Sequence, residues 1–99
     1  MITQDGMREI TEQILNLVSH GEVVVNNETK QIEVCRTNIT ENTVKILFML
    51  DDTVKGEITS SRVISKTGKV LLDKAEKITK NVTRGLLLVF SVRLTEVEG

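Results

Sequence analysis

The chain has 99 residues, 39% of them hydrophobic, and a formal net charge of -1 at neutral pH. This length supports one hydrophobic core and the composition is too apolar for a disordered tail, so we expect a single domain over residues 1–99. The sequence shows no apolar run long enough to span a membrane and no signal peptide, which predicts a cytoplasmic protein. With one cysteine and one histidine, it excludes an intrachain disulfide and a zinc site of ordinary ligand count.

Charge is distributed unevenly along the chain. Residues 1–54 carry four basic and nine acidic side chains, a net charge of -5, whereas residues 55–93 carry nine basic and three acidic ones, a net charge of +6. Such polarity can pair the acidic face of one subunit with the basic face of the next. The alternative is that both sets form solvated faces that keep a small domain soluble.

An amphipathic helix over residues 3–19 is the first element that the sequence predicts. Apolar side chains recur there at helical spacing with polar ones between them. The apolar stripe consists of Met7, Ile10, Ile14, Leu17 and Val18. Thr3 is the expected N-cap, and Gly21 is placed to end the helix in a left-handed conformation. We expect the stripe to cover an apolar surface.

From residue 22 the hydrophobic period changes to two, which predicts strands over about residues 22–97. We expect a first hairpin with its turn at Asn26-Asn27 and a return strand that directs Ile32 and Val34 inward. A mostly buried strand follows. Its expected inner face consists of Val44, Ile46, Phe48 and Leu50.

The second half of the chain predicts another hairpin and a long final strand. In order, we expect a loop at residues 51–56, strands near 57–65 and 69–76 around a turn at Thr67-Gly68, and a polar link over 76–85 anchored by Ile78 and Val82. The final strand, residues 86–97, is apolar on both faces at its start. It should therefore be central in a sheet or covered, with the helix as the candidate cover.

The order of these elements predicts the fold class. One N-terminal helix followed by five or six antiparallel strands with hairpin-length links indicates a mostly β (α+β) domain. Its strands form either one antiparallel sheet or a small β-sandwich, capped by the helix.

Gly68 and Lys69 lie side by side before an apolar run, as in a phosphate-binding loop. That loop needs a glycine five residues before Gly68 and a Ser or Thr after the lysine, and this chain has Val63 and Val70 there. The pattern therefore indicates a turn between strands. Its exposed tip is the candidate contact for a partner and consists of Lys66, Thr67, Gly68 and Lys69.

No residue pattern indicates a catalytic or metal site. His20, the only candidate base, lies at the predicted end of the helix, where the helix dipole already favours a histidine. Cys35 has a basic neighbour that favours the reactive thiolate, but a strand cysteine more often fills apolar space. Asp51, Asp52 and Glu57 are too few for calcium and too exposed for an acid–base pair. We therefore expect no enzymatic activity, no cofactor and no metal.

The alternative to a protein contact is a site for an anionic ligand or nucleic acid on the lysine-rich half of the chain. Its candidate residues are Lys74, Lys77, Lys80 and Arg84. Proteins that bind single strands add aromatic stacking platforms, and the only aromatic residues here, Phe48 and Phe90, occupy core-patterned positions. Nucleic acid is therefore a less favoured partner than protein.

Three segments carry a resemblance to a known family. They are the opening "MITQDGMREITEQI", the hairpin region "ITSSRVISKTGKVLLDKAEKITKN" and the closing "GLLLVFSVRLTEV". In this order they resemble the small tail or tail-fibre-associated proteins of tailed bacteriophages and prophages, over most of the chain from Ile2 to about Val97. The hairpin tip departs from the family pattern, which has an aspartate before the turn glycine and an aromatic residue, because this chain has Lys66-Thr67.

The resemblance implies a structural role in a virion, at the tail tip, the baseplate or the fibre attachment, without enzymatic activity. It implies a homo-oligomer that also contacts other tail proteins. The protein would be made in the cytoplasm of a bacterial host and then become part of the virion. The family offers no catalytic residues to assign to this sequence.

Overall fold

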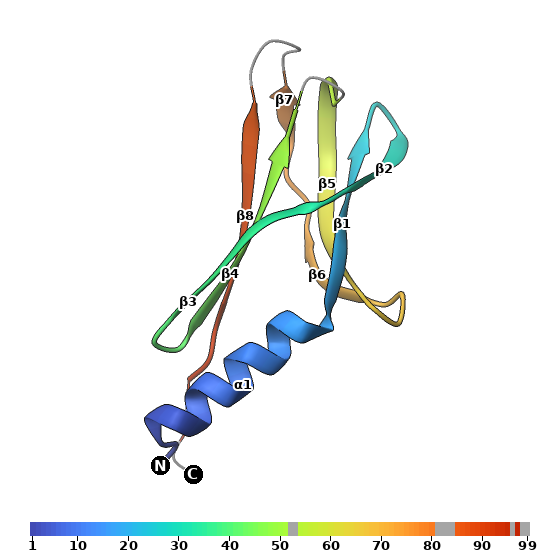
Figure 1. Cartoon of the computed structure of the whole chain (residues 1–99). Helices are drawn as coiled ribbons and strands as arrows, with labels where there is room; N and C mark the ends of the chain where they lie inside the picture. Colours follow the sequence, from blue (N-terminus) through green and yellow to red (C-terminus); the bar gives the residue numbers. More distant parts are fainter. Residues whose placement is uncertain (52–53, 81–84, 96, 98–99) are drawn as a thin grey trace.

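The computed structural model describes residues 1–51, 54–80, 85–95 and 97. In these ranges it contains one N-terminal helix followed by strands in two antiparallel sheets (Figure 1). The elements are α1 (Gln4–Leu17), β1 (Val18–Val25), β2 (Glu28–Ile32), β3 (Val34–Thr40), β4 (Thr43–Leu50), β5 (Gly56–Ser65), β6 (Val70–Lys74), β7 (Ile78–Lys80) and β8 (Leu86–Arg93). The mostly β fold class predicted from the sequence is confirmed.

The two sheets are connected along one side by the chain that runs from β2 to β3. Sheet A has the order β2-β1-β5-β6, with β7 also paired with β5, and sheet B has the order β3-β4-β8. Only Glu33 separates β2 from β3, so one bent stretch of chain crosses from sheet A to sheet B (Figure 1). On the other side, no strand pairing joins β8 to β6 or β7 among the described residues. We call this the open side.

The hydrophobic core lies between the sheets. The predicted inner face of β4 is confirmed, because Val44, Ile46, Phe48 and Leu50 are all buried. Sheet A contributes Val23, Val25, Ile58 and Val63, and β8 contributes Leu88 and Phe90. The rings of Phe48 and Phe90 meet edge to face, with centroids 5.9 Å apart and planes at 86°. This arrangement of two aromatic rings adds to the stabilisation from burial.

The helix begins where it was predicted to begin. Thr3 is the N-cap, and its hydroxyl accepts a hydrogen bond from the backbone N–H of Gly6 at 3.0 Å. The prediction that Gly21 ends the helix is wrong, because the chain turns at Val18 into extended backbone and enters β1 directly. The carbonyl of Leu17 is satisfied by tertiary contact instead of a cap, since it accepts a hydrogen bond from the N–H of Lys66 at 2.9 Å.

Gly21 has a different role inside β1. A Cβ at this position would lie 2.8 Å from Cε1 of Phe48 and 2.9 Å from Cγ1 of Ile32, so the glycine allows the close approach of these side chains. The prediction that His20 ends the helix is wrong for the same reason, because β1 already begins at Val18.

Two predicted turns are confirmed by their backbone angles. Asn26 and Asn27 have φ values of 50° and 67°, and Gly68 has a φ of 86°. The prediction that Ile32 and Val34 lie on one return strand is wrong, because the chain changes sheet between them. Ile32 ends β2, whereas Val34 begins β3 and pairs with Phe48 in sheet B.

The last third of the chain differs from the prediction in two ways. β7 forms within the segment predicted to be a polar link, and it pairs with the start of β5; the predicted anchor Val82 lies outside the described residues. The prediction that the final strand is central or covered is wrong. β8 is an edge strand paired with β4, and its outward side chains Leu87 and Val89 are 46% and 37% exposed. Helix α1 lies at one end of the sheets instead of over this face (Figure 1).

Candidate interaction surfaces

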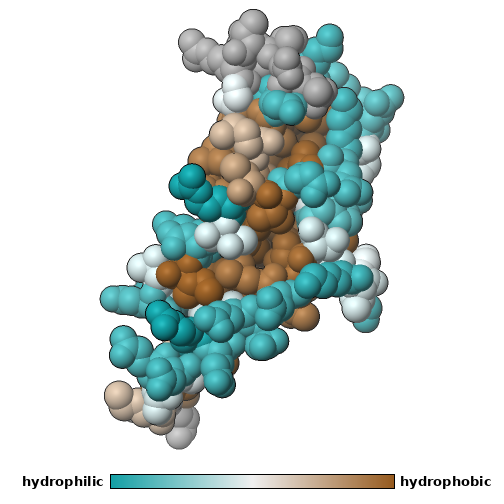
Figure 2. Space-filling model, viewed as in Figure 1, coloured by the Kyte–Doolittle hydropathy of each residue, from teal (hydrophilic) through white to brown (hydrophobic). Residues whose placement is uncertain are grey.

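An apolar surface is exposed on the outer face of sheet B. It consists of Leu47 and Met49 on β4 and Leu87 and Val89 on β8, and we call these four residues the sheet B patch. Met49, which is 49% exposed, pairs with Leu87, and the half-buried Leu47 pairs with Val89. Figure 2, viewed as Figure 1, shows a band of exposed hydrophobic side chains in the region between the two sheets, with hydrophilic residues along both margins. Single exposed apolar residues are ordinary, but adjacent ones on paired strands are typical of contact surfaces.

The same outer face also carries basic side chains. Arg36 lies opposite Leu47, beside the sheet B patch, whereas Lys45, opposite Ser91, and Arg93, opposite Thr43, lie toward the other end of the strands. All three basic side chains are exposed. No Asp or Glu occupies the outward positions of these paired rows. The face therefore combines an apolar end with a basic end.

Helix α1 exposes a second apolar surface. Ile10 and Leu17 are 43% and 53% exposed, and the half-buried Ile14 lies beside them. The expectation that the predicted stripe covers an apolar surface is confirmed for Ile14 and Val18, which pack against the core, and wrong for the exposed Ile10 and Leu17. The helix directs the side of Thr11, Ile14 and Leu15 toward the sandwich.

Thr11 is fully buried and finds its polar partners within the helix. Its hydroxyl oxygen lies 3.0 Å from the carbonyl oxygen of Met7 and 2.9 Å from that of Arg8, so these two acceptors share its proton. A buried threonine satisfied in this way lets the helix approach the sheets without an unpaired polar group.

The exposed stripe of α1 lies in an acidic surface depression. The depression is lined by Glu9, Ile10, Glu12, Gln13, Ile14 and Leu17. These residues include two carboxylates and no basic side chain. Elsewhere on the exposed helix surface Asp5 adds one negative charge and Arg8 one positive charge, so the helix keeps a net negative charge. The helix surface and the outer face of sheet B therefore carry opposite charges beside their apolar side chains.

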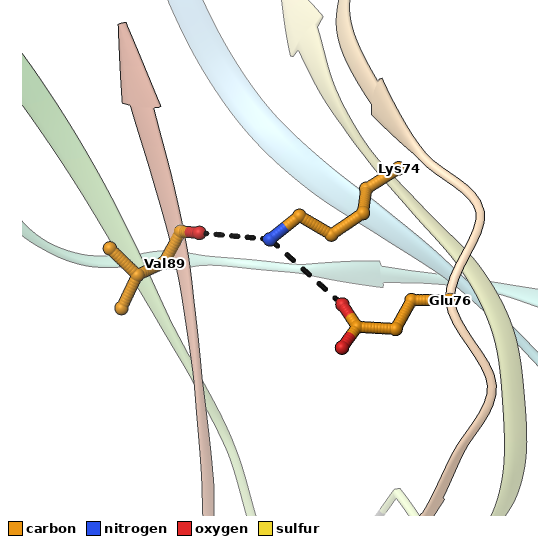
Figure 3. A network of polar contacts seen from close by, with 3 residues as sticks. All are labelled: Lys74, Glu76 and Val89. Carbon is orange, nitrogen blue, oxygen red and sulfur yellow. Dashed lines mark hydrogen bonds and ion pairs between the residues drawn. The ribbon is translucent and has the colours of Figure 1, made fainter.

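One lysine bridges the open side of the sandwich. Lys74, on β6, donates a hydrogen bond from Nζ to the carbonyl oxygen of Val89 on β8 at 3.3 Å and lies 4.0 Å from the carboxylate of Glu76 (Figure 3). The same ammonium group lies 5.3 Å from the centroid of the Phe90 ring. A lysine at the edge of a sheet opposes pairing with further strands, because its charge would have to be desolvated.

The predicted partner-contact tip lies where expected, at the turn between β5 and β6. All four of its residues, Lys66, Thr67, Gly68 and Lys69, are exposed. The hydroxyl of Ser65 organises the turn, since it accepts hydrogen bonds from the N–H groups of Thr67 and Lys69 at 3.3 and 3.1 Å. Contact between this tip and a partner stays a prediction.

The lysines predicted as an anion site each have an intramolecular partner. Lys74 contacts Val89 and Glu76, as described above. The Nζ of Lys77 lies 3.3 Å from a carboxylate oxygen of Glu57. Lys80 is only 4% exposed and donates to the backbone carbonyl of Asp51. Arg84 lies outside the described residues. Anion binding by this set stays a prediction. Because Lys80 is buried and hydrogen-bonded to the backbone, its ammonium group is not exposed to a ligand at the surface.

The candidate catalytic side chains lie on different sheets. His20 is half-buried on β1, with Nδ1 3.0 Å from the Ser19 hydroxyl, whereas Cys35 is exposed at a bulge on β3. Within the described ranges, no group of three or more His, Cys, Asp or Glu side chains could hold a metal ion. The helix in the described part of the chain is too short and too polar to cross a membrane.

Comparisons with protein-family models, with curated proteins and with solved structures found no match to this chain. The resemblance to phage tail proteins therefore stays a prediction from the sequence.

Proposed function

We propose that this chain is a non-enzymatic structural protein of a bacteriophage or prophage tail and that it acts through protein–protein contacts. The sheet B patch is the observation that carries the proposal. Its four adjacent apolar side chains lie on paired strands and face outward, where they gain free energy only by contact with another molecule. The position in the tail tip, baseplate or fibre attachment rests on the sequence resemblance alone.

The shape of the chain also supports a role in an assembly. Its radius of gyration is 15.1 Å and its principal extents are 47 × 24 × 23 Å. A compact domain of this length has a radius of gyration of about 13 Å. An elongated domain exposes more surface for its length, which favours lateral contacts with copies of itself or with neighbouring proteins.

Solution mass is the test of this proposal. We expect light scattering after size exclusion to detect a homo-oligomer, and we expect Leu87→Ser combined with Val89→Ser to reduce the mass. Val70→Ser combined with Leu71→Ser is the matched control, because it makes the same kind of change at exposed apolar positions on β6, outside the sheet B patch. A wild-type chain that remains monomeric at every concentration and salt level would contradict the homo-oligomer.

The rival function, binding of an anionic ligand or nucleic acid, has a separate test. Salt-dependent retention on heparin or DNA that is lost in Lys74→Glu with Lys77→Glu would favour it. Lys80 is left unchanged in this variant, because replacing a buried, hydrogen-bonded lysine by glutamate would unfold the site.

A further inference from the structure

We propose that α1 of one copy of the chain docks on the outer face of sheet B of a second copy. This inference rests on the proposed function and names the two surfaces through which self-assembly occurs. The helix contributes the exposed Ile10 and Leu17, the half-buried Ile14, which also packs against the core of its own chain, and Glu9 and Glu12. The sheet contributes the sheet B patch with Lys45 and Arg93.

The two surfaces have complementary chemistry. Each has apolar side chains that are about half exposed, such as Leu17 on the helix and Met49 on the sheet. The carboxylates of Glu9 and Glu12 flank the helix stripe, whereas only basic charges occupy the outward rows of sheet B. Two helix surfaces would bring like charges together, and so would two sheet faces. The pairing of helix with sheet is therefore electrostatically favoured over either self-pairing.

The dimensions of the surfaces also agree. A helix rises 1.5 Å per residue, so the 14 residues of α1 extend over about 21 Å. A strand rises about 3.3 Å per residue, so the outer face of β4 from Thr43 to Met49 extends over about 20 Å. The helix can thus lie along the length of the face.

The distribution of charge sets the direction of the docked helix. The apolar residue Leu17 is at the C-terminal end of α1, and the acidic residues lie in its first half and middle. On the sheet, the apolar row of Met49 and Leu87 is at one end, and Arg93 is at the other. The C-terminal end of the helix therefore lies over the sheet B patch, and its acidic part lies over Lys45 and Arg93.

The helix and the sheet face must come from different copies. Helix α1 continues into β1 without a linker, and the Leu17 carbonyl is hydrogen-bonded to Lys66. These connections hold α1 at the end of the sandwich, away from the outer face of its own sheet B (Figure 1). Each copy offers both surfaces, so the contact is either repeated around a ring or along a filament, or made reciprocally in a two-fold dimer.

Charge exchange tests the inference. One variant carries Glu9→Lys and Glu12→Lys, a second carries Lys45→Glu and Arg93→Glu, and a third carries all four substitutions. Sedimentation velocity over a range of concentrations gives the association constants. We expect each two-substitution variant to associate roughly tenfold more weakly than wild type, because like charges then face each other. The variant with all four substitutions should recover association.

An equimolar mixture of the two double variants should also recover association, because every helix then faces a sheet of opposite charge. Glu28→Lys and Lys55→Glu make the same charge changes at exposed positions outside both surfaces and should leave association unchanged. Circular dichroism of each variant checks that it is folded. If a reversal unfolds the chain, Glu9→Gln with Glu12→Gln and Lys45→Gln with Arg93→Gln replace it, and each should weaken association in low salt.

The unfavourable outcomes separate the inference from the proposed function. Folded double variants that associate like wild type, or a failure of recovery in the exchanged variant, would overturn the docking of α1 on sheet B. Self-association through another surface would then leave the proposed function intact. A monomeric wild type would overturn both the docking of α1 on sheet B and the homo-oligomer, but not contacts with other proteins. A monomer retained on DNA through Lys45 and Arg93 would assign the basic rows to nucleic acid and also overturn the inference.

Discussion

Apolar residues are buried between the two sheets but remain partly exposed on α1. Between the sheets, Ile46 and Phe48 are 1% and 0% exposed and pack against residues of both sheets. On α1, Ile10 and Leu17 remain about half exposed, and the residue that is fully buried is Thr11. The sandwich is therefore stabilised by its own core, whereas the helix keeps apolar surface available for another molecule. Substitutions can test this contrast, and those in the core should have the largest effects.

Phe48→Ala should be the most destabilising of these changes. It removes a fully buried ring that contacts Phe90 edge to face, so we expect the free energy of unfolding to fall by about 3–5 kcal/mol. Chemical denaturation followed by circular dichroism measures the loss. Leu87→Ala is the control on the outer face and should cost less than about 1 kcal/mol. An equal loss of unfolding free energy in the two variants would show that the outer face of sheet B is buried as deeply as its inner face.

Gly21→Ala tests how tightly the core is packed where β1 faces β4. The added methyl group would lie within 3 Å of Phe48 and Ile32, which must then shift. We expect a loss of about 1–3 kcal/mol from this overpacking, measured in the same denaturation experiment. Gly68→Ala cannot serve as the control without a steric clash, because an alanine at its φ of 86° would strain the backbone. A neutral result at Gly21 would show that the core has room at this point.

Local patterns in the sequence were sufficient to predict the inside of this core. The alternation from Val44 to Leu50 predicted which side chains of β4 face inward, since strand burial follows a period of two. The turn at Asn26-Asn27 was predictable because asparagine tolerates positive φ. Gly21 was misassigned because a glycine after a helix has the same local appearance as a cap and as a point of close approach. Only the position of Phe48 in space separates the two.

The candidate surfaces were less predictable because they depend on strand pairing. The exposed tip at Gly68 followed from turn chemistry alone. The apolar outer residues of β4 and β8 were visible in the sequence, but their adjacency depends on the register that pairs Met49 with Leu87. The bridge from Lys74 to Val89 depends on how β6 and β8 approach each other across the open side. Sequence periodicity contains neither kind of information.

Lys74→Ala tests the protection of the open side. The substitution removes an exposed hydrogen bond to Val89 and a cation–π contact with Phe90, so we expect a loss of about 0.5–1 kcal/mol. We expect a larger effect on the rate of aggregation, because the exposed edge of β8 then lacks the lysine charge that opposes pairing with a strand of another chain. Turbidity and light scattering over time should show faster aggregation for Lys74→Ala than for Lys74→Arg, which keeps the charge. Identical aggregation rates would show that β8 is protected by another feature.

Ile10→Ser should have the smallest effect on stability and is the most direct test of the contrast. Because Ile10 is already 43% exposed, replacing it removes little buried surface, and we expect the free energy of unfolding to change by less than about 0.5 kcal/mol, apart from a small helix-propensity effect. Ile46→Ser is the matched control, because it places the same side chain in the core and should cost at least about 3 kcal/mol through a cavity and a buried hydroxyl. If α1 serves another molecule, Ile10→Ser should weaken self-association while the fold remains intact. A large loss of stability with unchanged association would place Ile10 among the residues that hold the helix to its own sandwich.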